Sequence, residues 1–298
     1  MSAQIQTAAG AIKAKKKKRG QLRLIAIRFR KNKLAMIGLI VLSLLMIVCL
    51  TASLWLDYKL VTRQSIRNAY QPPSFEHLFG TDQFGRDLFA RIIYGGQISL
   101  FAGLLTVAIA FVLGVGLGGA AGYFGGKVDN IIMRFCDIIM SVPGVLLSMC
   151  IVAALGQGLV KMLIALSVAQ IPRQARTVRA AVMTLRGQEF VEAARSCGTS
   201  QRRILLRHIL PNVLGPIIIG VMQGLGGTIL SIASLGFLGI GIAPPTPEWG
   251  TIISENQNSL MYYPYLGIIP GIFIMVAVLS LNFVGDGLRD ALDPKQKN

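Results

Sequence analysis

Residues 98–119 read ISLFAGLLTVAIAFVLGVGLGG, and this stretch decides the class of fold because it carries no charged side chain. A membrane-spanning helix needs roughly 20 apolar residues to cross about 30 Å of hydrocarbon. Its glycines are the small residues that let membrane helices approach one another closely. Over the whole chain of 298 residues, 53% are hydrophobic and 14% are charged. We therefore expect a membrane protein.

Further stretches have the length and apolar character of spans. The first, from Leu34 to Leu56, is uncharged, whereas the fourth has an apolar first half and an Arg-rich second half. The sequence predicts an all-α membrane protein with six transmembrane helices at about residues 34–56, 98–122, 128–155, 159–185, 209–242 and 264–284. The transmembrane domain would cover 34–286, with cytoplasmic segments at 1–33 and 287–298. The first apolar stretch is too long for the core of a cleaved signal peptide, so we expect it to remain as a helix.

The orientation follows from the distribution of Lys and Arg, which are retained on the cytoplasmic side. Residues 1–33 hold eleven basic residues and no acid, and residues 172–208 hold eight Arg against two Glu. Residues 57–94 hold five basic and four acidic residues, and residues 243–263 contain no Lys or Arg. Six spans with both termini in the cytoplasm place all four segments on the side that their charge predicts.

The net charge of +17 includes the basic run at residues 13–19. A basic run just before a first span is typical of orientation signals and of contact with anionic lipid head groups. We therefore expect membrane lipid, and not nucleic acid, as the partner of this segment.

The sequence contains no pattern typical of chemistry on a substrate. The four cysteines and two histidines are scattered, so no disulfide framework, metal site or cofactor is predicted. The glycine-rich turn before Lys127 lacks the first Gly and the Ser or Thr of a phosphate-binding loop, since Ala121 and Val128 stand there. Work on a solute would therefore have to be powered by another protein.

One polar segment interrupts the apolar sequence, between the fourth and fifth predicted spans. Within residues 189–207, Phe190, Ala193, Ala194 and Cys197 recur at helical spacing among charged residues. Gly198 is suited to the end of a helix, where a left-handed residue is needed. We expect a short helix, a turn at Gly198 and a second helical piece along the cytoplasmic surface. Such an element either only terminates a span or fits into a groove on a partner.

The spacing in this segment resembles a known family. Glu192-Ala-Ala, three residues, Gly198 and then Leu210-Pro211 are similar to the signature loop in permease subunits of ATP-binding-cassette importers. This resemblance implies that the loop forms a coupling helix that docks on an ATPase subunit, where ATP and Mg bind. It assigns coupling to Glu192, Ala193, Ala194, Gly198, Leu210 and Pro211. One position departs from the general pattern, because His208 stands where that pattern has Ile.

Other motifs are similar to the second, C-type permease subunit of dipeptide and oligopeptide systems. They lie at residues 80–87, 235–241, 244–250 and 285–294. The resemblance implies a bacterial inner-membrane complex of two homologous permease subunits, two ATPase subunits and an extracytoplasmic solute-binding protein. A peptide importer is the leading interpretation. Import of nickel, glutathione or another small solute, and an ion channel or membrane scaffold without ATP coupling, are the alternatives.

Two further sets of residues are candidates. Arg134 and Asp137 lie three apart in the third predicted span, where they either pair with each other or line the solute path. In the two outer segments, docking of the binding protein or a purely structural role is expected for Gly80, Asp82, Arg86, Asp87 and Trp249. The aromatic residues Trp249, Tyr262 and Tyr263 are also typical of the membrane interface.

Overall fold

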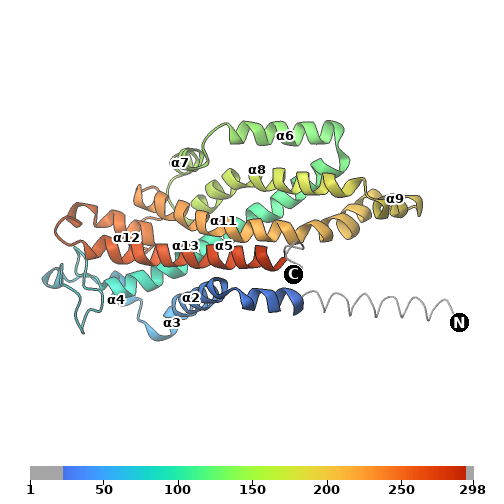
Figure 1. Cartoon of the computed structure of the whole chain (residues 1–298). Coiled ribbons are helices and arrows are strands. Elements are labelled where there is room, and N and C mark those ends of the chain that lie inside the picture. Colours follow the sequence, from blue (N-terminus) through green and yellow to red (C-terminus); the bar gives the residue numbers. More distant parts are fainter. Residues whose placement is uncertain (1–22, 293–298) are drawn as a thin grey trace.

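The computed structural model describes residues 23–292, and this part of the chain forms helices and loops without a β-strand (Figure 1). One isolated bridge, between Thr81 and Asp87, is the extent of its β-pairing. The basic run at residues 13–19 and the end of the predicted tail, residues 293–298, lie outside the described residues.

Within residues 23–292, five long helices and one bent pair form most of the structure. The long helices are α2 (Lys33–Leu50), α5 (Leu88–Phe124), α8 (Leu159–Arg186), α11 (Leu210–Phe237) and α13 (Tyr265–Leu292), and the pair is α6 (Gly126–Met140) with α7 (Gly144–Leu155). Short elements connect them: α3 (Ala52–Trp55), α4 (Lys59–Thr62), α9 (Glu189–Ser196), α10 (Gln201–Arg203) and α12 (Trp249–Glu255), the 3-10 helices η1 (Ile66–Asn68) and η3 (Gln257–Ser259), and the π-helix η2 (Ile204–Ile209).

Four described helices are long and apolar enough to cross a membrane. They are α2, α5, α11 over Ile217–Phe237, and α13, and the number rises to five if α6 and α7 form one bent span. The fourth predicted span, α8, has sufficient length at 28 residues but carries several Lys and Arg side chains. Length and composition therefore identify four or five candidate spans of the six expected.

The third predicted span differs most from its expectation. Residues 128–155 were expected to form one helix, but α6 and α7 meet at an angle of 84°. Pro143 explains the break, because proline disfavours helical backbone at the preceding residue and lacks the N–H for an intrahelical bond. Pro143 adopts extended backbone and α7 begins directly after it. Figure 1 accordingly shows α6 from the side and α7 end-on.

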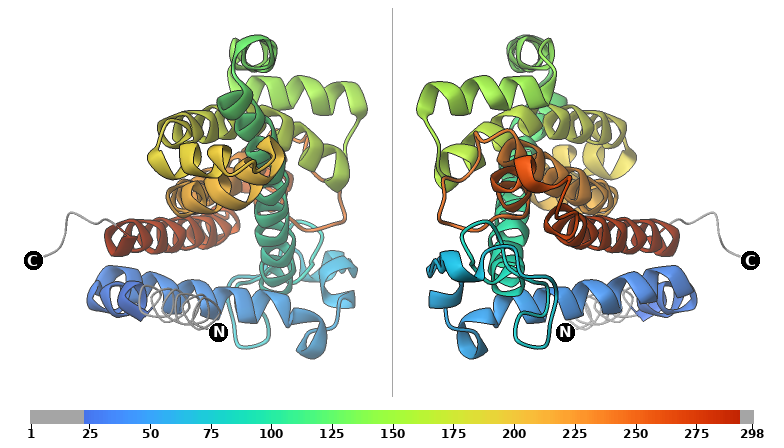
Figure 2. Two further views of the ribbon diagram at one scale, coloured as in Figure 1. Left: turned by 90° about the vertical axis from the view of Figure 1, so that its right-hand side faces the viewer. Right: turned by 90° about the vertical axis from the view of Figure 1, so that its left-hand side faces the viewer.

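Glycines bring α5 and α8 together along most of their lengths. A Cβ atom on Gly122 would lie 2.8 Å from the Arg179 carbonyl oxygen, and Cβ atoms on Gly114 and Gly118 would meet Gln174 and Ala175. The small residues of α5 thus permit the close packing that the sequence predicts. α6 lies at the periphery of the bundle, on the side opposite α2 (Figure 2).

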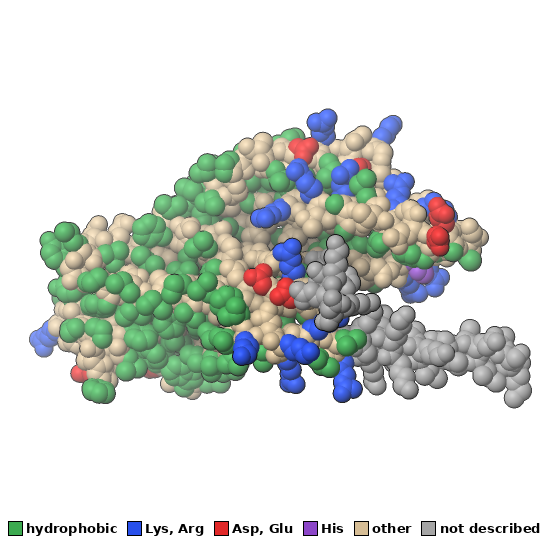
Figure 3. Space-filling model, in the orientation of Figure 1, with side chains coloured by type: hydrophobic (Ala, Val, Ile, Leu, Met, Phe, Trp, Pro, Cys, Tyr) green, Lys and Arg blue, Asp and Glu red, His purple; other side chains and the backbone are tan. Residues whose placement is uncertain are grey.

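The two ends of the described chain lie together. Asn32, which caps α2, donates a hydrogen bond from its amide to Asp290 near the end of α13 at 3.2 Å. Figure 3 shows a broad apolar surface over much of one face, whereas charges of both signs gather toward the end of the molecule where α9 lies. The outer segments that contain α4 and α12 lie at the opposite end (Figure 1).

Candidate functional site

Helix α9 packs against the rest of the molecule through Val191 and Ala194. Val191 is fully buried in a cluster contributed by α5, α8, η2 and α11: Tyr123, Val178, Val182, Ile204, Leu205, Ile209, Val213 and Ile217. Ala194, one turn later, is half-buried against the same cluster. The outer face carries Phe190, Glu192 and Ala193, all exposed. The inward face of α9 is thus Val191 and Ala194, and Phe190, Ala193 and Cys197 of the expected apolar face are exposed instead.

Gly198 ends α9 as the sequence predicts. Its φ is +73°, the left-handed region in which glycine is favoured. The Thr199 N–H donates to the Ala194 carbonyl at 3.1 Å and the Gly198 N–H donates to the Arg195 carbonyl at 3.0 Å. These two bonds form a Schellman motif, which satisfies the free carbonyls at the helix end.

The second helical piece returns the chain from α9 to α11. It begins as α10 and continues as the π-helix η2 before Leu210 opens α11. Leu210 is half-buried on the cluster around Val191, and Pro211 is exposed in the first turn of α11, where proline is well tolerated. Leu210 and Pro211 therefore shape the start of α11, whereas Glu192 and Ala193 present side chains outward.

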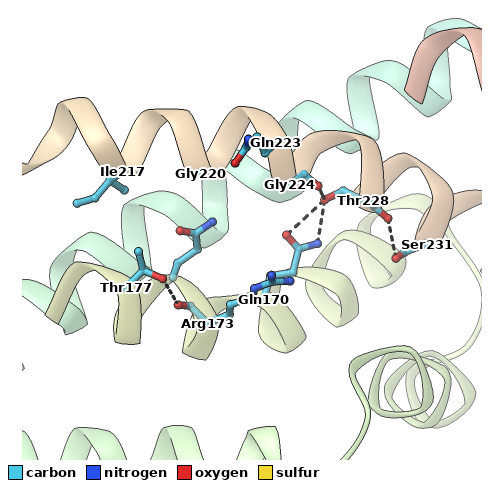
Figure 4. Close-up of a pocket in the computed structure, with 11 residues that line it drawn as sticks. Gln170, Arg173, Thr177, Ile217, Gly220, Gln223, Gly224, Thr228 and Ser231 are labelled. Atoms are coloured by element: carbon cyan, nitrogen blue, oxygen red, sulfur yellow. Dashed lines mark hydrogen bonds between the residues drawn. The ribbon is translucent and has the colours of Figure 1, made fainter. Parts of the chain in front are cut away.

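A polar hollow lies between α8 and α11, with a volume of about 530 Å³ (Figure 4). Its lining consists of Gln170, Arg173, Gln174, Thr177, Ile217, Gly220, Gln223, Gly224, Gly227, Thr228 and Ser231. Gln170 and Thr228 join its two walls by a hydrogen bond of 3.2 Å. The lining contains one charged residue, Arg173, and no acid.

Glycines leave this hollow open on the α11 side. Cβ atoms added to Gly220, Gly224 or Gly227 would meet nothing within 4 Å. These glycines recur at helical spacing on one face of α11, opposite the polar face of α8 in Figure 4.

Two ion pairs join α6 to α8. Asp137 accepts a hydrogen bond from Arg176 at 2.7 Å, and both side chains are about half exposed. Asp129 accepts two hydrogen bonds from Arg179, the second at 2.6 Å. The predicted pairing of Asp137 with Arg134 is thus replaced by a pair between helices, and Arg134 is exposed on α6.

Four charged side chains with little exposure form a cluster at the end of the molecule that contains α4 and α12. Asp82 accepts from the Arg86 Nε at 2.6 Å and from Arg91 at 3.2 Å, and Glu255 accepts from both arginines. Asp82, Arg86 and Arg91 are at most 2% exposed, and the Glu255 side chain is 11% exposed. The ionic cluster therefore ties the loop before α5 to the end of α12.

The other outer candidates are structural as well. The Asp87 carboxylate accepts from the Ala90 N–H at 2.8 Å, which caps α5, and it contacts the His77 Nδ1 at 2.8 Å. Gly80 is buried with φ +79°. Trp249 is fully buried and its indole N–H donates to the Ile92 carbonyl at 3.0 Å. The burial of Asp82, Arg86, Gly80 and Trp249 favours the structural role over docking of the binding protein, the two expectations for these residues.

The two outer segments pack together as one cap, residues 57–87 and 244–264. Tyr70 stacks on Tyr263 with ring centroids 4.2 Å apart, and its hydroxyl lies 2.7 Å from the Ser259 hydroxyl. The Tyr265 hydroxyl donates to the Thr81 carbonyl at 2.9 Å. The most exposed large apolar side chains of this cap are Ile66, Phe75, Leu78, Met261 and Tyr262.

Glu248 provides the N-cap of α12 in a buried position. Its carboxylate accepts from the Gly250 N–H at 3.0 Å, the Thr251 N–H at 2.9 Å and the Ser99 hydroxyl at 3.1 Å. Burial raises the pKa of this carboxyl above its ordinary value, although these hydrogen bonds act in the opposite direction.

Among residues 23–292, no three His, Cys, Asp or Glu side chains are grouped so that they could hold a metal ion.

Comparison with known families decides the class of protein. Residues 110–298 match the family described as binding-protein-dependent transport system inner membrane component, and residues 20–73 match the N-terminal transmembrane domain of oligopeptide transport permease C. The chain belongs to this family. It is therefore a permease subunit of an ATP-binding-cassette importer in the bacterial inner membrane, of the C type found in peptide and nickel systems.

Curated relatives cover nearly the whole permease. It is 44% identical to the dipeptide transport system permease protein DppC of Alkalihalophilus pseudofirmus, over 91% of this chain and 89% of the relative. It is 43% identical to the glutathione transport system permease protein GsiD of Escherichia coli, with the same coverage.

Solved structures support the fold of the permease. A chain of the MetNI methionine ABC transporter, in inward facing conformations, matches 69% of this chain and 98% of its own length with a TM-score of 0.57 at 19% identity. A chain of an amino acid ABC transporter matches 66% of this permease and 92% of its own length with a TM-score of 0.52 at 16% identity.

The polar hollow is the part of the permease that the sequence analysis missed. Its signal is present in the fourth predicted span, where Gln170, Arg173, Gln174 and Thr177 recur at helical spacing. The opposing glycines are also visible in the sequence, but only the fold shows that they face α8 and leave the space unfilled.

Proposed function

We propose that this permease forms half of the path for peptides in an importer driven by ATP hydrolysis on partner subunits. A homologous permease would close the open side of the α8–α11 hollow. Six crossings, with α6 and α7 as one bent span and α8 as a further span, would place both termini and α9 in the cytoplasm. The adjacent ends of α2 and α13 support this even number of crossings.

The proposal that α9 couples this permease to an ATPase rests on the geometry of α9. This short helix lies at the charged end of the molecule, with Val191 buried beneath it and Glu192 and Ala193 exposed. A helix held from one side and exposed on the other is suited to transmit the movement of a docked ATPase. Gly198 sets the end of that surface, and ATP and Mg would bind on the two ATPase subunits.

Peptide is the solute class that the relatives favour. The named solutes of the two relatives above are dipeptide and glutathione, and glutathione is itself a tripeptide. The binding protein would dock on the opposite end of the molecule, on the exposed apolar side chains of the cap. The buried Asp82 cluster then serves as the support of that surface.

A bulky substitution at Ala193 tests the coupling. Because Ala193 is exposed, Ala193→Trp leaves the packing of this chain intact while it obstructs a groove on a docked ATPase. We expect peptide uptake and ATPase activity stimulated by the binding protein to fall at least about tenfold, equivalent to about 1.4 kcal/mol. The measurement uses the complete complex in proteoliposomes, with co-purification of the ATPase subunits as a second readout.

The matched control is Arg202→Ala, which alters another exposed residue in the following α10. It should retain uptake. Normal uptake by the Ala193→Trp complex would show that α9 does not transmit the movement.

A further inference from the structure

Arg173 differs from its neighbours on α8 in its electrostatic surroundings. Arg176 pairs with Asp137 and Arg179 pairs with Asp129, both across to α6. Among the described residues 23–292, no carboxylate lies within ion-pair distance of Arg173, and its side chain is exposed at the hollow. Arg173 lies near the middle of α8, at the start of the basic segment 172–208, and its positive charge borders the hollow without an acidic partner in the lining.

The rest of the lining supplies hydrogen bonds but no negative charge. Gln170 and Gln174 flank Arg173 on α8, and Thr228 and Ser231 face it from α11. Asp286 accepts a hydrogen bond from the lining residue Gln223 at 2.9 Å, but Asp286 itself does not line the hollow. The hollow therefore presents one unpaired cation among neutral donors and acceptors.

We propose that Arg173 is a specificity-determining residue that binds the carboxylate of the solute as it passes between α8 and α11. The inference rests on the proposed function and names the chemical group that the path recognises. A guanidinium donates two parallel hydrogen bonds to a carboxylate, which adds geometric selection to the attraction of opposite charges.

The volume and chemistry of the hollow agree with a small carboxylate-bearing solute. Its size of about 530 Å³ lies within the range of about 300–1,000 Å³ that is usual for small-molecule sites. An uncomplexed divalent metal ion would find no carboxylate, imidazole or thiolate in this lining, and those are the side chains that bind such ions. A lining with one guanidinium and otherwise neutral side chains therefore favours a peptide or glutathione over bare nickel.

The experiment compares three variants in the complete complex with its partner subunits and binding protein. Arg173→Gln removes the charge and keeps hydrogen-bonding capacity, whereas Arg173→Lys keeps the charge. Lys161→Gln is the matched control, because it removes a positive charge from an exposed position in the first turns of α8, outside the hollow. Uptake of labelled trialanine, with a free carboxylate, is compared with uptake of trialanine amide after loading of each on the binding protein has been measured.

For trialanine, we expect a loss of about tenfold or more in Arg173→Gln, as for a lost charge-assisted hydrogen bond. Arg173→Lys should stay within about threefold of wild type, since a single ammonium replaces only part of the guanidinium contact. Lys161→Gln should match wild type. The defect of Arg173→Gln should disappear with trialanine amide, because the group that the arginine binds is then missing.

Wild-type uptake of trialanine by Arg173→Gln would overturn the inference. An equal loss in Arg173→Gln and Arg173→Lys would also overturn it, because the shape of the side chain and not its charge would then matter. If the wild-type complex itself takes up neither peptide, the proposed function fails, whereas a transporting wild type with an unaffected Arg173→Gln refutes only the role of Arg173.

Discussion

Arg91 illustrates how single residues determine the outer end of this permease. It is fully buried and contacts both carboxylates of the ionic cluster, Asp82 and Glu255. Removing charges from water costs several kcal/mol per ion, and only mutual attraction with good geometry offsets that cost. The two positive and two negative charges are balanced, so removal of Arg91 leaves an excess of one negative charge in the cluster.

We expect Arg91→Met to destabilise the folded permease by roughly 3–5 kcal/mol, the usual effect of breaking a buried ion pair. Thermal unfolding of the purified subunit in detergent measures this loss. Arg67→Met, in the exposed part of the same outer segment, is the control and should unfold like wild type. Equal stability of the two variants would contradict the structural role of the cluster.

Residue spacing alone did not identify the ion-pair partners of these side chains. Asp82 and Arg86 were recognised as a polar group in the sequence, but Glu255 lies far along the chain and burial is a property of the fold. Arg134 and Asp137 have a spacing that permits pairing, yet α8 brings Arg176 close to Asp137 from another helix. Gly198, in contrast, was predictable because a helix end requires a backbone conformation that glycine favours.

At the scale of elements, α12 depends on a buried carboxylate at its first turn. The folded state raises the pKa of Glu248 above its ordinary value, so it binds the proton more tightly than the unfolded chain does. The corresponding stability is fully present below the ordinary pKa of glutamate, about 4.3, and is lost as the pH rises through the raised pKa.

Glu248→Gln should therefore flatten the dependence of stability on pH. The Gly250 and Thr251 N–H groups donate to different oxygens of the Glu248 carboxylate, so the single glutamine oxygen keeps only one of these bonds at every pH, but the side chain does not ionise. We expect the wild-type melting temperature in detergent to fall more steeply above pH 4.3 than that of the variant. Tryptophan fluorescence of thermally unfolding samples at a series of pH values provides the measurement. The control Glu189→Gln, at an exposed position, should show the same change of melting temperature with pH as the wild type. The same pH dependence in Glu248→Gln would contradict the prediction, because the Glu248 carboxyl would then ionise as freely as in water.

The existence of most long helices could be predicted, and their ends could not. Apolar length identified the region of α5, but the helix begins at Leu88 and not near residue 98, because Arg91 is neutralised inside the protein and does not need to stay in water. α11 ends at Phe237, five residues before the expected end at residue 242. Gly239, two residues after this helix end, adopts φ +74°. The break between α6 and α7 had a visible cause in Pro143, although its angle depends on packing.

At the scale of the whole molecule, α6 is held to the bundle mainly through α8. The Arg176 and Arg179 pairs join the two helices, and Cys136 between the paired positions is buried at 1% exposure. Polar pairs thus fix a helix that carries a large exposed apolar surface, which includes Ile131, Phe135 and Ile138.

We expect Arg179→Gln to loosen α6 and expose Cys136. The pair with Asp129 is partly exposed, so its contribution is set at about 1 kcal/mol, which corresponds to about fivefold faster reaction of Cys136 with a maleimide. Cys150 and Cys197, both exposed, are first replaced by serine to remove background labelling. Arg186→Gln, at an exposed position on the same helix, should leave the rate unchanged. An unchanged rate in Arg179→Gln as well would mean that packing alone holds α6.

The charge distribution along the sequence agrees with the positions of the segments in the whole molecule. The described parts of the two basic segments, residues 23–33 and 172–208, extend toward α9 and the paired ends of α2 and α13, while the cap with α12 lies at the opposite end. The hollow could not be derived in this way, because it depends on how α8 and α11 face each other.

The π-helix η2 has a consequence for the register of α11. A π turn holds one more residue than an α turn, and each residue turns an α-helix by about 100°. The extra residue within Ile204–Ile209 therefore acts like a one-residue insertion that rotates everything after it. Gly220, Gly224 and Gly227 face α8 only in this register, so the loss of a single codon from η2 would turn the glycine face of α11 away from Arg173.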